Sequence, residues 1–245
     1  MIMNPLSFEL EQTSVWSFPE RGSWATHNGS YRGNWSPYVP RNIILRYSRE
    51  GDWILDQFLG SGTTLVEAKL LNRNAIGIDV NKDALALSRK NLAFNSDSTS
   101  RIELRLGSAT NLKFIKDNSI DLICCHPPYA NIIRYSENIP DDLSLLSYDF
   151  FLESIRIVAS EAHRVLKAGK ICAFMMGDIR QNGNTKPLGF ESMNAFCSAG
   201  FSLKEIIVKT QHNCRSTQLW ENTAKSFLLL AHEYIFILRK NATPI

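Results

Sequence analysis

The sequence has few of the features that mark secreted, membrane-bound or metal-binding proteins. Its five cysteines form no Cys-x-x-Cys pair, so we expect reduced thiols and no metal site. No apolar run reaches the roughly 20 residues that span a bilayer, and the first residues do not form a signal peptide. The net charge of +3 favours an anionic partner only weakly. We therefore expect a cytoplasmic protein, long enough at 245 residues for an α/β domain with a sizeable core.

A glycine-rich turn lies between a short buried strand and a helix. Residues 53–56 are apolar until the last position, which is typical of a strand that ends at a site. Residues 65–71 contain strong helix formers. Between them, Gly60 and Gly62 allow a sharp turn and the close approach of a ligand. The order of strand, glycine turn and helix predicts a cofactor loop.

The residues after the glycines add an anion site and an acid. Thr63 and Thr64 are placed to cap the helix, whose N-terminal amides attract a negative group. A second strand over residues 74–79 ends in Asp79, about twenty residues past the glycines, where an acid meets ribose hydroxyls in dinucleotide-type folds. The loop lacks the third glycine of a nicotinamide site and the lysine of a P-loop, so neither of those cofactors is favoured.

A second candidate loop follows a later buried strand. Residues 119–125 are apolar except for Ser119 and Asp121 and lead directly into His126-Pro127-Pro128-Tyr129. The two prolines cannot continue a strand, so they form a rigid corner. The tyrosine is then held at the carboxyl edge of the sheet, where ligands bind in open α/β folds.

The two loops together resemble those of S-adenosylmethionine-dependent DNA amino-methyltransferases. The first matches the cofactor pattern Asp-x-Phe-x-Gly-Ser-Gly-Thr-Thr, and the second resembles the Asp/Asn/Ser-Pro-Pro-Tyr/Phe catalytic loop. The resemblance implies S-adenosylmethionine as cofactor and methylation of an exocyclic base amine, adenine N6 or cytosine N4, in a restriction-modification context. The cofactor residues that it implies are Asp56, Phe58, Gly60, Ser61, Gly62, Thr63, Thr64, Asp79 and, at the end of a third strand, Ser108.

The resemblance also assigns the catalytic loop, with one departure. In the family the first side chain and a proline carbonyl accept hydrogen bonds from the target amine, while the aromatic residue stacks on a flipped-out base. Here His126 stands where the family has Asp, Asn or Ser. A neutral imidazole accepts one hydrogen bond and can take the released proton, whereas an imidazolium can only donate. His126, Pro127, Pro128 and Tyr129 are thus the expected catalytic residues.

Double-stranded DNA is the expected partner, although no separate recognition domain is visible. Residues 1–40 form an aromatic-rich extension that stacks on bases, lines a cofactor lid or only packs on the catalytic domain of residues 41–245. Loops at 130–148 and 209–225 are further candidates for reading DNA. A short recognition site, a homodimer or a specificity partner would each explain the missing domain. The candidate DNA contacts are Arg134, Arg180, His212 and Arg215.

The fold implied is a Rossmann-like class I methyltransferase: a doubly wound, seven-stranded, mostly parallel sheet with an antiparallel C-terminal hairpin. Besides the elements above, the pattern predicts helices at 40–47, 83–94, 150–166 and 192–198, strands at 101–106 and 171–176, and a hairpin of 203–208 with 233–238.

Three other functions stay open. Guanine-N2 methyltransferases of RNA and glutamine methyltransferases of proteins use similar Pro-Pro-aromatic loops. An inactive relative that binds cofactor or DNA is the third, and His126 is its only support. The sequence favours adenine over cytosine only weakly, and it leaves the recognition site and any companion endonuclease undefined.

Overall fold

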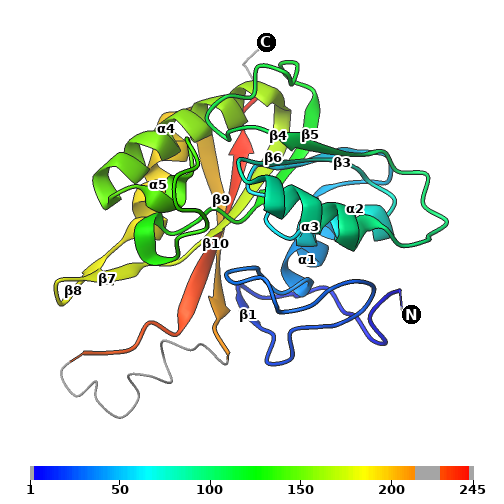
Figure 1. The fold of residues 1–245 in the computed structure, drawn as a ribbon, viewed down its shortest axis with the longest axis horizontal. Helices are drawn as coiled ribbons and strands as arrows, with labels where there is room; N and C mark the ends of the chain where they lie inside the picture. Colours follow the sequence, from blue (N-terminus) through cyan, green and yellow to red (C-terminus); the bar gives the residue numbers. More distant parts are fainter. Residues whose placement is uncertain (1–2, 213–226, 243–245) are drawn as a thin grey trace.

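A β-sheet whose strands bury side chains on both of its faces forms the centre of the structure. The protein is described by a computed structural model that covers residues 3–212 and 227–242 (Figure 1). Within these residues one sheet has eight strands, in which β10 is antiparallel to both neighbours and the other pairings are parallel. Their spatial order is β1 (Val15–Ser17), β9 (Phe201–Thr210), β10 (His232–Lys240), β6 (Leu166–Met176), β5 (Ile120–Cys125), β2 (Trp53–Asp56), β3 (Asn74–Asp79) and β4 (Ile102–Leu106).

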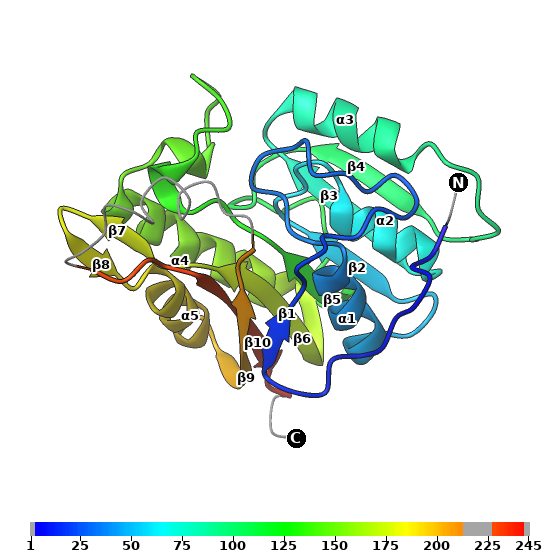
Figure 2. The same ribbon diagram turned by 90° about the horizontal axis from the view of Figure 1, so that it is seen from below.

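Helices cover both faces of this sheet. The helices α1 (Tyr38–Tyr47), α2 (Thr63–Leu70) and α3 (Lys82–Leu92) lie on one face, and α4 (Tyr148–Val165) and α5 (Leu188–Ser198) lie on the other (Figure 2). In β5, Leu122 and Cys124 belong to one buried cluster, while Ile123 and Cys125 belong to the other. A strand covered on both sides needs such a continuous apolar run. The predicted doubly wound fold and its C-terminal hairpin are confirmed.

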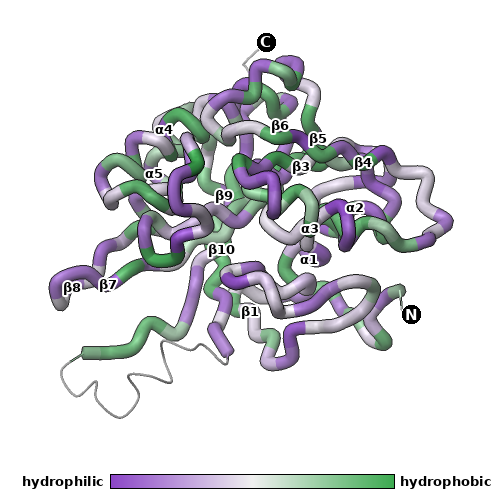
Figure 3. Tube along the Cα trace, viewed as in Figure 1, coloured by the Kyte–Doolittle hydropathy of each residue, from purple (hydrophilic) through white to green (hydrophobic). Residues whose placement is uncertain are grey.

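The predicted number of seven strands is wrong by one. Residues 14–40 show no strand period, yet β1 pairs in parallel with Val208–Thr210 at the edge of the sheet. Three residues are too few for an alternating pattern, and Trp16, which is buried between exposed neighbours, fixes the position of the strand. A small hairpin outside the main sheet, β7 (Ile179–Gln181) with β8 (Asn184–Lys186), was also not predicted; its tip is hydrophilic (Figure 3).

A buried carboxylate ties the N-terminal extension to the domain. The side chain of Glu67, in α2, has no exposed surface, and its oxygens accept hydrogen bonds from Trp24 Nε1, His27 Nε2 and Arg41 Nη1, each at 2.7 Å. The extension supplies two of these donors and α1 supplies the third. Burying a carboxylate is costly unless such partners surround it, so the three contacts form one unit. Whether residue 40 is a true domain boundary stays a prediction.

The described residues also bear on membrane and metal binding. None of their helices is both long and apolar enough to cross a bilayer. In the same residues no group of three or more His, Cys, Asp or Glu side chains is placed to hold a metal ion. The four cysteines in this part of the chain, Cys124, Cys125, Cys172 and Cys197, are free thiols.

Replacing Glu67 by alanine should destabilise the whole protein. The variant leaves Arg41 buried without its carboxylate, which costs about 3–5 kcal/mol of unfolding free energy. Urea denaturation measures the change, with Glu153→Ala on the exposed face of α4 as a control expected within about 0.5 kcal/mol of wild type. Equal stability of the two variants would contradict the role of Glu67.

Candidate active site

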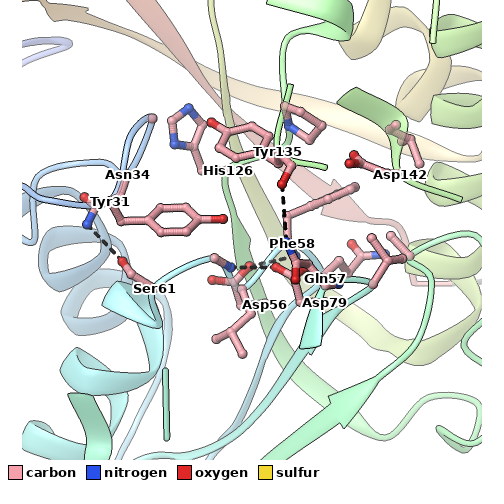
Figure 4. Close-up of a pocket in the computed structure, with 18 of the residues that line it drawn as sticks. Tyr31, Asn34, Asp56, Gln57, Phe58, Ser61, Asp79, His126, Tyr135 and Asp142 are labelled. Atoms are coloured by element: carbon pink, nitrogen blue, oxygen red, sulfur yellow. Dashed lines mark hydrogen bonds between the residues drawn. The ribbon is translucent and has the colours of Figure 1, made fainter. Parts of the chain in front are cut away.

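A pocket opens at the carboxyl ends of β2, β3 and β5. The chain order reverses between β2 and β5, which is where open α/β sheets bind ligands. The pocket encloses about 770 Å³ of space, part of it open to solvent. Asp56, Gln57 and Asp79 lie on one side, opposite His126 and Tyr135 (Figure 4). The two loops singled out in the sequence therefore meet at one cavity.

Not every predicted site residue lines this pocket. Those that do are Asp56, Phe58, Gly60, Ser61, Thr63, Asp79, His126 and Pro128. Those that do not are Gly62, Thr64, Ser108, Pro127 and Tyr129. The hydroxyl of Ser108 pairs with that of Thr110 at 2.7 Å, while its neighbours Gly107 and Ala109 face the cavity.

The cofactor loop owes its shape to a left-handed glycine. Gly62 has φ of +85° and occupies the N-cap position of α2, a conformation that costs other residues energy. Thr63 and Thr64 are the first helical residues and make no capping hydrogen bond, so the predicted threonine cap is wrong. The backbone turn itself, rather than a side chain, presents the first amides of the helix.

Asp79 is held by the loop that it faces. One carboxylate oxygen accepts the Gly60 amide and the other accepts the Asn81 amide, both at 2.9 Å. Burial raises the pKa of Asp79, while these backbone hydrogen bonds act in the opposite direction. Each oxygen keeps a second lone pair for a hydroxyl group of a ligand. Asp79 is thereby oriented before any ligand arrives.

Asp56 is more deeply buried and has an unusual protonation equilibrium. Its side chain is almost inaccessible and accepts the Phe58 amide at 3.0 Å. Burial raises the pKa of Asp56 to about 7. A cationic group placed next to it would favour the carboxylate form. The pocket thus has an acid whose charge near neutral pH depends on what is bound.

Gln57 was not identified from the sequence. It lines the pocket and is almost completely buried, yet neither its carbonyl oxygen nor its amide nitrogen has a hydrogen-bond partner. Unpaired buried amides are rare in folded proteins, because each costs about 1–3 kcal/mol. A ligand with both a donor and an acceptor would satisfy this group. Nothing in the sequence distinguishes Gln57 from a spacer inside the glycine loop.

The extension and the 130–148 loop meet over the pocket. Tyr31 and Tyr135 stack with ring centroids 5.9 Å apart, and Asn34 donates to the Ser61 hydroxyl at 2.9 Å (Figure 4). A side chain at Gly33 would collide with the Tyr135 hydroxyl. Two segments about a hundred residues apart in the sequence therefore form one wall of the site.

The catalytic loop is fixed by packing and by hydrogen bonds. The His126 ring stacks on Trp35 with centroids 5.4 Å apart, and its Nε2 lies 2.9 Å from the Tyr129 hydroxyl. That hydroxyl donates to Glu233 Oε1 at 2.8 Å. Burial lowers the pKa of His126 to about 4, so the imidazole is neutral at physiological pH. A neutral imidazole has one nitrogen free to accept a hydrogen bond.

The three predicted DNA contacts that the structure describes lie outside the pocket. Arg134 is exposed on the loop that contains Tyr135. The guanidinium of Arg180 donates to the carbonyls of Gly183 and Leu228. His212 lies 3.0 Å from the Ser17 hydroxyl and 3.2 Å from that of Thr210. The fourth residue, Arg215, lies outside the described residues.

Comparison with known proteins gives consistent matches to methyltransferases. A family model described as DNA methylase matches residues 7–90 and 120–244, and one described as a methyltransferase domain matches residues 57–131. A SAM-dependent methyltransferase of Methanosarcina mazei shares the fold, with a TM-score of 0.57 and 18% sequence identity over 82% of this chain and 98% of its own.

Curated relatives match over shorter segments. Type II methyltransferase M2.DpnII of Streptococcus pneumoniae is 49% identical over 61 residues, which are 25% of this chain and 23% of the relative. Type II methyltransferase M2.MboI of Moraxella bovis is 36% identical over 89 residues, 36% of this chain and 33% of the relative. The release factor glutamine methyltransferase of Streptomyces coelicolor is 29% identical over 126 residues, 48% and 43% of the two chains. The aligned parts thus span less than half of each relative.

Replacing Asp56 by asparagine should change how stability depends on pH. Because the pKa of Asp56 is raised, the folded state binds its proton more tightly than the unfolded state does. Its contribution to stability is complete below about pH 4 and is lost as pH rises towards 7. Between pH 5 and 7.5, wild type should therefore lose about 2–3 kcal/mol of unfolding free energy relative to Asp56→Asn. Urea denaturation of both proteins across this range is the measurement, and parallel pH curves would contradict the shift.

Proposed function

Because the chain belongs to the DNA methylase family, we propose that it transfers a methyl group from S-adenosylmethionine to an exocyclic base amine of double-stranded DNA. The observation that carries this proposal is the convergence of the Asp56–Asp79 loop region and His126 on one pocket. The type II methyltransferases among its relatives support a restriction-modification context. Adenine N6 and cytosine N4 both remain candidate acceptors.

The residues of the pocket fit an adenosyl amino acid. Asp79 offers free lone pairs for ribose hydroxyls, and Leu59, Val80 and Ala109 provide apolar walls for a purine. Asp56 supplies a carboxylate for the cationic methionine end, and burial makes that carboxylate sensitive to such a charge. S-adenosylmethionine would supply an electrophilic methyl group on sulfur. The unpaired amide of Gln57 is suited to the remaining polar atoms.

The catalytic loop would orient and activate the target amine. A hydrogen bond from the amine to His126 and another to a proline carbonyl reduce delocalisation of the nitrogen lone pair into the base. Because burial lowers the pKa of His126 to about 4, its free nitrogen is an acceptor over the whole physiological range. The same nitrogen can take the proton that the amine loses after transfer.

The candidate DNA contacts among the described residues lie outside the pocket. We propose Arg134, Arg180, His212 and Arg215 as phosphate or base contacts; Arg134 and His212 are exposed and Arg180 is half-buried. Arg180 would have to give up two backbone hydrogen bonds to reach DNA. We propose that a homodimer or a specificity partner supplies the recognition that these few residues cannot.

A protein glutamine side chain is the second candidate acceptor. The similarity to a release factor glutamine methyltransferase favours it, because that alignment covers 48% of this chain. The family match over residues 7–90 and 120–244 is more extensive and favours DNA. The amide of glutamine and the amine of a base present similar hydrogen-bond donors, so the pocket alone does not separate them.

The first test is methyl transfer from labelled S-adenosylmethionine to a mixture of DNA, RNA and protein. We expect label in DNA, and mass spectrometry of the nucleosides should give N6-methyladenine or N4-methylcytosine. Label in protein alone would replace the proposal by the second candidate. Cofactor binding with no label in any polymer would mean an inactive relative or a missing partner.

Asp79→Ala should weaken cofactor binding without changing the fold. Losing a charge-assisted hydrogen bond to ribose costs about 1.5–3 kcal/mol, which raises Kd roughly 10- to 150-fold. Asp79→Asn, which keeps one acceptor oxygen, should give a smaller increase. Calorimetry measures both, with the exposed Asp97→Ala as control. A wild-type Kd for Asp79→Ala would remove this residue from the cofactor site.

A further inference from the structure

A chain of polar contacts leads away from His126 to the far hairpin of the sheet. His126 Nε2 lies 2.9 Å from the Tyr129 hydroxyl, which donates to Glu233 Oε1 at 2.8 Å. The other oxygen of Glu233 accepts a hydrogen bond from Lys209 Nζ at 3.0 Å. Glu233 and Lys209 are register partners on β10 and β9, so the sheet itself places them side by side. The end of the chain of contacts is therefore fixed by backbone pairing.

The number of protons on His126, Tyr129 and Glu233 determines which group donates in each hydrogen bond. Burial opposes ionisation of Glu233, but Lys209 and the hydrogen bonds from its partners hold the pKa of the carboxyl below its usual value. Glu233 is therefore a carboxylate and can only accept. Burial and the charge of Glu233 raise the pKa of Tyr129 well above the usual value, so the phenol keeps its single proton. That proton is donated to Glu233, and the Tyr129 oxygen can only accept from His126.

We propose that Glu233, acting through Tyr129, holds His126 in the tautomer with the proton on Nε2, so that Nδ1 presents its lone pair to the target amine. This inference rests on the proposed function. It makes Tyr129 and Glu233 positioning residues for the histidine, a role that the family motif does not assign to an aromatic residue that stacks on a base.

The surroundings of the imidazole are consistent with this role. His126 lines the pocket, and Nδ1 has no hydrogen-bond partner among the described residues. Stacking on Trp35 fixes the plane of the ring. The charged groups that act on His126 are Glu233, which favours the imidazolium, and Lys209 and Arg21, which oppose it. The ring is thus fixed in orientation and in tautomer, and burial keeps it neutral.

The opposite tautomer would prevent His126 from accepting a hydrogen bond from the target amine. With the proton on Nδ1, an N–H group would face the N–H groups of the amine, and the amine would lose its acceptor. After methyl transfer, the proton released by the amine nitrogen passes to Nδ1 and gives an imidazolium. Its Nε2 proton stays bonded to Tyr129, with the negative charge of Glu233 beyond. The hydrogen bonds through Tyr129 to Glu233 therefore stabilise both the neutral imidazole, which accepts, and the imidazolium that forms after transfer.

Glu233→Gln tests the direction of the hydrogen bonds between Glu233, Tyr129 and His126. Lys209 can only donate, so it retains the amide oxygen of the new side chain and turns the amide NH2 towards Tyr129. The Tyr129 hydroxyl then donates to His126 Nε2, and the histidine proton moves to Nδ1. Nitrogen NMR of histidine-labelled protein should show this reversal, with kcat about tenfold or more below wild type and an unchanged cofactor Kd.

Tyr129→Phe is a second variant, because it keeps an aromatic ring and removes only the hydroxyl. If Tyr129 only stacks on a base, the phenylalanine variant should be fully active; the proposed chain instead predicts a mixture of tautomers and a loss of kcat. Tyr234→Phe is the matched control, since its hydroxyl also pairs with a histidine, His232 Nε2 at 2.9 Å, on the same strand but outside the pocket. The control should retain wild-type kcat.

The outcomes separate this inference from the proposed function. A wild-type spectrum with the proton on Nδ1, or an unchanged tautomer and kcat in Glu233→Gln, would overturn the inference even if DNA is methylated. A reversed tautomer with wild-type kcat would overturn the role of the chain in turnover. If wild type methylates no polymer, the nitrogen spectrum still decides the tautomer independently of the proposed function.

Discussion

The site depends on one buried carboxylate that is not part of it. Glu67 accepts hydrogen bonds from Trp24, His27 and Arg41, and so joins the extension, α1 and α2 directly. The segment held in this way continues into Tyr31, which forms part of the wall of the pocket. Because a carboxylate inside a protein is stable only when its lone pairs are satisfied, all three donors must be in place together. The wall of the pocket is therefore held in place by an interaction that lies outside the pocket.

Two acids that line the pocket and one behind the catalytic loop show how buried carboxyl groups can serve different purposes. Asp79 is oriented by two backbone amides and needs little from a ligand to remain in place. Asp56 has a pKa raised to about 7 by burial, so its charge responds to a bound cation. Glu233 is also buried, yet Lys209 keeps its pKa low. The same carboxyl chemistry thus provides a fixed acceptor, a charge-sensitive group and a permanent anion.

Much of the fold and part of the site could be predicted from the sequence. Apolar runs that end in Asp56 and Asp79, and a Pro-Pro corner after β5, have local patterns, so both loops could be singled out, and residues of both line the pocket. The partners that complete the site have none. Glu233 lies 104 residues from Tyr129, and only the pairing of β10 with β6, and of β6 with β5, brings it close. β1 was missed for the same reason, since three residues show no period of their own.

The same short strand has a consequence for solubility. The side of β9 that faces away from β10 is an edge of the sheet except where β1 covers it. Unpaired backbone groups on such an edge are templates for association with other chains. β1 closes the end at Val208–Thr210, and the open part of the strand presents Lys204 and Glu205, charged side chains that discourage such pairing. A chain shortened to begin at α1 would lose this cover. It would then be prone to aggregate through β9, even where its catalytic residues remained correctly placed.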